Sequence, residues 1–161
     1  MKVILGLLLG FASAGAAIAE SRMLVQLPAL LDPGVVVDRD VSEECKLAGL
    51  VGDRIFEQLK TVEPGATAAP ASAGADRFVR LRITAARMIP AVQVRRLTVA
   101  IEIVEGDRVL ANLSFRDTSA AMPGYGTGLC DIMGKIATGI GKKAAGWVRS
   151  SYAEPAPPTQ K

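Results

Sequence analysis

The sequence predicts an α+β fold, a two-layer sandwich in which two helices cover one face of an antiparallel-rich sheet of about four strands. Three observations support this prediction. A strand-like segment opens the chain after residue 22, two segments have helical periodicity, and three consecutive segments alternate apolar and polar residues. The predicted order is therefore β-α-β-β-β-α, within a single domain from residue 20 to 152.

The first 19 residues have the features of a secretory signal peptide. Lys2 precedes an apolar run over residues 3–16, and Ala17-Ile18-Ala19 is a typical cleavage signal. An uncleaved anchor is the alternative, but the run is short and rich in glycine and alanine. We expect a periplasmic or secreted protein without a transmembrane segment after cleavage. No cysteine follows the apolar run, so a lipid anchor is not expected.

The first strand is predicted over residues 23–27 and ends at Pro28. A turn at 32–34 precedes a second β-branched run at 35–37. These two runs form either a hairpin or one strand followed by an irregular segment, and the pattern does not decide between them.

The first helix follows, with Asp40 or Ser42 as its N-cap and Pro64-Gly65 as its end. Its apolar face comprises Ala48, Val51, Ile55, Leu59 and Val62. The acidic residues at its start do not fit a calcium loop, which needs glycine where Glu43 stands. The low-complexity residues 63–76 are predicted to be a flexible loop, and 153–161 a disordered Pro-rich tail.

Three strands are predicted between residues 78 and 116, each with one apolar and one polar face. Successive side chains of a strand point to opposite faces. The first of the three strands therefore has Val79, Leu81, Ile83 and Ala85 on its apolar face. If the apolar sides of the last two strands are to share a face, an odd loop must join them. We therefore expect a three-residue turn at 105–107 with positive φ at Gly106 or Asp107.

The polar face of these strands carries more arginine than acid. Its four arginines are Arg80, Arg82, Arg96 and Arg116. They could bind a small anionic ligand or a partner, and the alternative is a solvated face that discourages aggregation.

Seven glycines lie between Gly124 and Val148, and two motifs that they suggest both fail. The dinucleotide fingerprint has its third glycine one residue early, and the Walker A spacing is one residue too long, with Ile136 in place of a hydroxyl. Four charged residues exclude a membrane span. On a helical wheel, apolar residues gather on one side and charged residues on the other. This predicts an amphipathic helix from Leu129 to Arg149, capped by Thr127.

Glycines lie on both flanks of this second helix, where they permit close packing. They are Gly134, Gly139, Gly141 and Gly146. Packing inside the monomer is one interpretation, and self-association into a homo-oligomer is the other. Lys143 is the one charge on the apolar side, and its amine is expected to reach outward to water.

Cys45 and Cys130 predict one disulfide in an exported chain. If the first strand is followed directly by the helix, the two helices are parallel. Both cysteines then lie in the first turn of a helix at the same end of the sheet. A hairpin at 23–37 would reverse the first helix and forbid the bridge, leaving two free thiols.

Composition excludes several classes of function. The chain has no histidine, which removes Ser-His-Asp and Cys-His catalysis and histidine-ligated metals. A net charge of +3 and 4% aromatic residues argue against nucleic acid. We therefore expect no cofactor, no metal and no catalytic residue, with a secreted enzyme or enzyme inhibitor as a remote alternative.

The order of elements, the opening "LVQLPALLD" and the closing amphipathic helix resemble small periplasmic α/β domains of Gram-negative envelopes. These include ABC-type transport auxiliary components and curli-secretion-type outer-membrane proteins. The resemblance covers most of residues 22 to 150 and is topological. It implies a non-enzymatic envelope accessory or adaptor protein that contacts protein or lipid. Those relatives usually carry a lipid-modified cysteine after the signal peptide, which this chain lacks.

Overall fold

A computed structural model describes residues 23–70, 77–89, 94–120 and 128–153. The predicted signal peptide, the tail beyond residue 153 and the Thr127 cap lie outside these residues.

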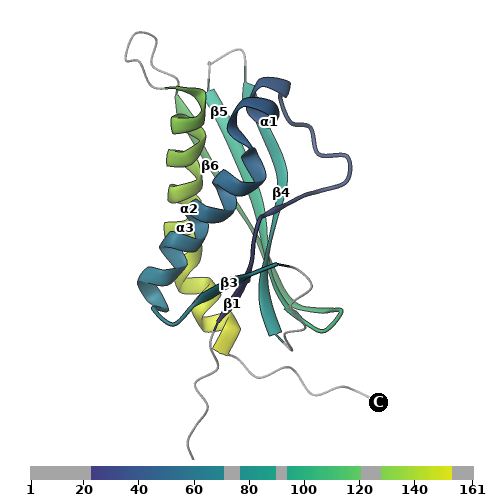
Figure 1. The fold of residues 1–161 in the computed structure, drawn as a ribbon, viewed down its shortest axis with the longest axis vertical. Coiled ribbons are helices and arrows are strands. Elements are labelled where there is room, and N and C mark those ends of the chain that lie inside the picture. Colours follow the sequence, from purple (N-terminus) through teal and green to yellow (C-terminus); the bar gives the residue numbers. More distant parts are fainter. Residues whose placement is uncertain (1–22, 71–76, 90–93, 121–127, 154–161) are drawn as a thin grey trace, which may run out of the picture.

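The described residues form an α+β fold with three helices and a six-stranded mixed sheet (Figure 1). The strands are β1 (Leu24–Gln26), β2 (Leu30–Leu31), β3 (Thr67–Ala69), β4 (Arg77–Ile89), β5 (Val94–Glu105) and β6 (Arg108–Ala120). Their order is β3-β1-β4-β5-β6, with β2 beside β4. β1 runs parallel to both β3 and β4, and β4, β5 and β6 are antiparallel. The predicted α+β class is confirmed, but in the described residues the sheet has six strands rather than about four, and there are three helices rather than two.

The segment from residue 23 to 37 runs in one direction along β4. β1 and β2 both pair with it in parallel, and an isolated parallel bridge joins Val37 to Ala86. The hairpin alternative is thus excluded, and the next helix must return antiparallel to β1. This geometry is what the cysteine pairing requires.

β3 lies inside the stretch that we predicted to be a flexible loop. Thr67 N–H donates to the Met23 carbonyl at 2.9 Å, and Leu27 N–H donates to the Ala69 carbonyl at 3.0 Å. Residues 67–69 of this stretch thus form a strand through backbone hydrogen bonds to β1, although none of their side chains is buried.

The first helical segment is two helices, α1 (Arg39–Cys45) and α2 (Leu47–Val62). Lys46 separates them with φ of 46°, in the left-handed region. Asp38 takes the N-cap position, without a side-chain cap bond, so the N-caps predicted at Asp40 and Ser42 are wrong. Helical periodicity continues through Lys46, so the break cannot be recognised from the pattern of apolar residues.

Two β-bulges change which residues of β4 and β6 face the core, compared with the prediction. The register shifts between Ile83 and Ala85, so Ala86 is buried in place of Ala85. The β5–β6 turn has two residues, Gly106 and Asp107, with Gly106 at φ of 58°. The extra residue needed to match the apolar faces lies at Leu110 in β6 rather than in the turn.

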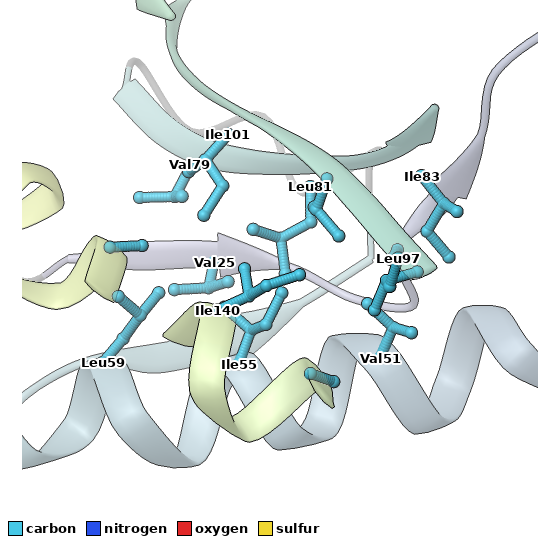
Figure 2. Packing of buried hydrophobic residues seen from close by; sticks show 14 of the residues in the cluster. Val25, Val51, Ile55, Leu59, Val79, Leu81, Ile83, Leu97, Ile101 and Ile140 are labelled. Carbon is cyan, nitrogen blue, oxygen red and sulfur yellow. The ribbon is translucent and has the colours of Figure 1, made fainter. Parts of the chain in front are cut away.

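The core lies between the sheet and a layer formed by α2 and α3 (Leu129–Ala153), which run side by side over one face (Figure 1). Val51, Ile55 and Leu59 from α2 and Ile140 from α3 meet strand residues such as Leu81 (Figure 2). Tyr152 attaches the end of α3 to the sheet, because its hydroxyl donates to the Arg77 carbonyl and accepts from Leu24 N–H.

Candidate functional site

The sheet face opposite the helices is the candidate functional site. Cross-strand partners share a face of the sheet, and the residues next to buried Leu81, Leu97 and Ile101 point away from the helices. The four arginines named from the sequence belong to this helix-free face. The structure divides them into two groups with different surroundings.

Arg80 and Arg82 are held in ion pairs. Arg80 Nε donates to Glu102 Oε2 at 2.6 Å, and Arg82 donates to Glu102 and to Asp32. Glu102 is 7% exposed, so it lies beneath the two guanidinium groups. The hydrogen bond to Asp32 is the main cause of a raised pKa at Arg82. The positive charge of these two arginines is therefore balanced by the carboxylates of Glu102 and Asp32.

Arg96 and Arg116 form the second group, together with Arg87. Arg87 lies directly opposite Arg96, and Arg116 lies opposite Thr98 on the next strand. In the part of the chain that the structure describes, no ion pair involves any of these three arginines. The Arg96 Nε is buried and has no hydrogen-bond partner. Leaving a buried donor without an acceptor costs about 1–3 kcal/mol, so an acceptor that bound at this end of the face would be favoured.

Arg87 was not predicted to lie on this face, because it has an odd residue number and the other arginines of its strand have even ones. Arg80 and Arg82 are even-numbered, and regular alternation would place Arg87 under the helices. The bulge between Ile83 and Ala85 shifts the alternation by one residue and brings Arg87 opposite Arg96. A register break inside a strand leaves no clear signal in a single sequence.

The four glycines of α3 differ in what surrounds them. A Cβ at Gly141 would lie 2.9 Å from Gln58 Cβ and 3.2 Å from Ile55 Cα, so α2 and α3 approach closely there. At Gly139 a Cβ would overlap the carboxylate of Asp117. Gly134 allows ordinary contact with Arg54 and Leu50, at 3.6 Å. Among the described residues, nothing lies within 4 Å of a Cβ built at Gly146, so packing inside the monomer does not require a glycine there.

Gly139 makes room for an ion pair between the sheet edge and α3. Asp117 of β6 accepts the Lys143 ammonium group, with Nζ and Oδ2 3.1 Å apart. Lys143 is thus paired with an acid at the rim of the core, whereas the sequence predicted only that it would reach water.

A groove of about 640 Å³ lies on the outer side of the helix layer. Its polar lining comes from Arg54 of α2 and from Asp131, Lys135, Thr138 and Lys142 of α3. Arg54 is paired with Glu57 at 3.3 Å. The groove is open and lacks a buried polar group, so it is a weaker candidate than the arginine end of the sheet.

Cys45 and Cys130 form a disulfide with Cα atoms 5.1 Å apart. Cys130 lies in the first turn of α3, as expected, but Cys45 is the last residue of α1 rather than in the first turn of a helix. The break at Lys46 still leaves Cys45 at the start of α2, so the two helices are joined at the same end.

Within residues 23–70, 77–89, 94–120 and 128–153, no helix has the length and hydropathy of a membrane span. The same residues contain no group of three or more Cys, Asp or Glu side chains placed to hold a metal ion.

The fold is one of the α+β sandwiches found in several bacterial proteins of known structure. No family model and no curated protein matches the chain. A PelC dodecamer from Paraburkholderia phytofirmans matches with a TM-score of 0.53 at 13% identity, covering 83% of this chain and 89% of that chain. A DUF330 protein from Xanthomonas campestris matches with a TM-score of 0.56 at 12% identity, covering 81% and 84%.

A hypothetical protein from Chlamydia trachomatis has a TM-score of 0.55 at 11% identity, covering 82% of this chain and 98% of its own. At these identities the comparisons show a shared fold. They are compatible with the predicted resemblance to Gram-negative envelope domains, without assigning the chain to one superfamily.

Proposed function

We propose that this chain is an exported, non-enzymatic accessory or adaptor protein of the cell envelope that contacts a protein or lipid partner. The observation that carries the proposal is the Cys45–Cys130 disulfide. Disulfides persist in oxidising compartments and are rare in the bacterial cytosol. A disulfide in a chain that begins with a signal-like segment therefore supports work outside the cytoplasm.

The fold supports the same proposal. PelC and the DUF330 protein share most of this architecture, and the PelC structures are described as dodecamers. Self-association of this chain is accordingly part of the proposal. Sedimentation of the mature protein should give a species larger than the monomer, and a monomer at every concentration would contradict this part.

Partner capture in the native cell tests the accessory role. The full chain, crosslinked in its own organism, should yield adducts with envelope proteins or with envelope lipid. The matched control is the chain without residues 1–19, which should remain in the cytoplasm and lose those adducts. Identical adducts from both forms would contradict an envelope role.

A second candidate is a soluble binder of a small anionic ligand on the helix-free face. The specific observation in its favour is the buried Arg96 Nε, which has no hydrogen-bond partner. A third class, a secreted enzyme or enzyme inhibitor, has no residue constellation in its support. Activity screening of the purified protein would test it.

A further inference from the structure

The helix-free face concentrates positive charge at one end of three adjacent strands. Arg87 on β4 and Arg96 on β5 are direct cross-strand partners. Arg116 on β6 is the diagonal neighbour of Arg96, because Arg96 pairs with Thr118 two residues further along. Direct partners have Cβ atoms about 4.5–5.5 Å apart, and diagonal ones are within reach of long side chains. The three side chains therefore start from neighbouring positions on one face of the sheet, within reach of one another.

Among the described residues, no carboxylate forms an ion pair with these three arginines, and the neighbouring Asp38 accepts from Met88 N–H and from Arg95 instead. Like charges directly opposite one another destabilise a strand pair. Elsewhere on this face the repulsion between arginines is offset by an acid, since Arg80 and Arg82 both pair with Glu102. The nearest carboxylate in sequence, Asp117, pairs with Lys143 towards the helix layer. The sequences of segments 90–93 and 121–127, which flank these strand ends, contain no acidic residue.

Hydrogen-bond donors accompany the charge. The Arg96 Nε is a buried donor without an acceptor, and the side chains of Arg87 and Arg116 are exposed. Thr98 and Thr118 are the cross-strand partners of Arg116 and Arg96, so their hydroxyl groups belong to the same face. Within the described residues, the area thus has several donors and no carboxylate paired with its arginines.

We propose that Arg87, Arg96 and Arg116 form a binding site for a phosphate group. A phosphomonoester has three strong acceptor oxygens and a charge near −2, which suits several neighbouring guanidinium groups without a paired acid. The source is either a free phosphate compound or the headgroup of an anionic lipid. This site deepens the second candidate function by moving it away from Arg80 and Arg82. It holds whether or not the chain is exported.

Thermal melting of the mature chain with its disulfide intact tests the site. Inorganic phosphate serves as the soluble probe at low millimolar concentration and constant ionic strength, where general salt effects on stability are small. Vesicles of phosphatidylcholine with or without phosphatidic acid form the lipid arm, read by co-sedimentation. A saturable rise in melting temperature identifies a free phosphate compound as a source. Binding confined to phosphatidic acid vesicles identifies the headgroup.

The variants Arg96→Gln and Arg116→Gln should each weaken binding by about tenfold or more, as expected for the loss of charge-assisted hydrogen bonds. Without phosphate, both should melt at the same temperature as the wild type or higher, since each relieves like-charge repulsion. Lys135→Gln removes a basic residue on α3 and should leave binding unchanged. Arg96→Lys keeps the charge but not the fork, and should bind more weakly than the wild type.

Three results would overturn the proposal. One is the lack of binding in both arms, and another is binding that persists in Arg96→Gln and Arg116→Gln. The third is binding that Arg82→Gln abolishes while those two variants retain it. That result would leave the second candidate function standing and place its site at the Glu102 end of the face.

Discussion

Cys45 and Cys130 are 85 residues apart in sequence, and their Cα atoms lie 5.1 Å apart in the fold. The bridge joins the end of α1 to the first turn of α3. A crosslink that closes so long a loop stabilises a protein mainly by restricting its unfolded chain, typically by about 2–4 kcal/mol.

We expect the double variant Cys45→Ala, Cys130→Ala to fold with a free energy of unfolding lower by about that amount. Denaturant unfolding measures it. The wild type in reducing buffer is the control and should match the variant. An unchanged midpoint in both would show that the bridge does not stabilise the fold.

Gly141 and Gly146 are a matched pair on α3. Gly141→Leu should lower the free energy of unfolding by about 1–3 kcal/mol, because its side chain would overlap Gln58 and Ile55 of α2. Gly146→Leu should raise it by several tenths of a kcal/mol, since no described residue lies within 4 Å of a Cβ at that position and leucine favours a helix. Equal shifts in the two melting curves would contradict close packing of α2 on α3 at Gly141.

Lys46 has positive φ between α1 and α2, a conformation that costs a non-glycine residue about 1–2 kcal/mol. Lys46→Gly should therefore leave stability unchanged or raise it slightly, because glycine also gains freedom in the unfolded chain. Lys46→Val should lower stability by about 1 kcal/mol or more. If valine were tolerated as well as glycine, α1 and α2 would be one continuous helix.

Glu105 accepts two hydrogen bonds from Arg77, at 2.8 and 3.2 Å, which hold the pKa of its carboxyl group below the ordinary 4.5. Because the folded pKa is the lower one, this stabilisation is present above pH 4.5 and is lost as the pH falls through the folded pKa.

The melting temperature of the wild type should consequently fall more between about pH 5 and pH 3 than that of Glu105→Gln. Glu44→Gln, at an exposed position, should keep the wild-type acid dependence. If Glu105→Gln also kept it, the pair with Arg77 would not contribute to acid stability.

The sequence was informative where side-chain periodicity follows burial. Val51, Ile55 and Leu59 marked the inner face of α2, and alternation marked β4 to β6. It did not predict features that depend on the backbone alone. β3 forms through backbone hydrogen bonds in an alanine-rich stretch, and Lys46 interrupts a helix without changing the spacing of its apolar residues.

The candidate site was predicted in part for the same reason. Arg96 and Arg116 followed from alternation. Arg87 depended on a bulge in β4, and the neutralisation of Arg80 and Arg82 depended on Glu102 and Asp32, which are distant in sequence.

We propose that this chain works outside the cytoplasm as a disulfide-bonded accessory protein. The most direct test is the intact mass of the protein from the envelope fraction, alkylated under denaturing conditions without reduction. We expect a chain that begins at Glu20, with no alkyl group and no lipid. A mass that retains residues 1–19, or that carries an alkyl group on both Cys45 and Cys130, would contradict it.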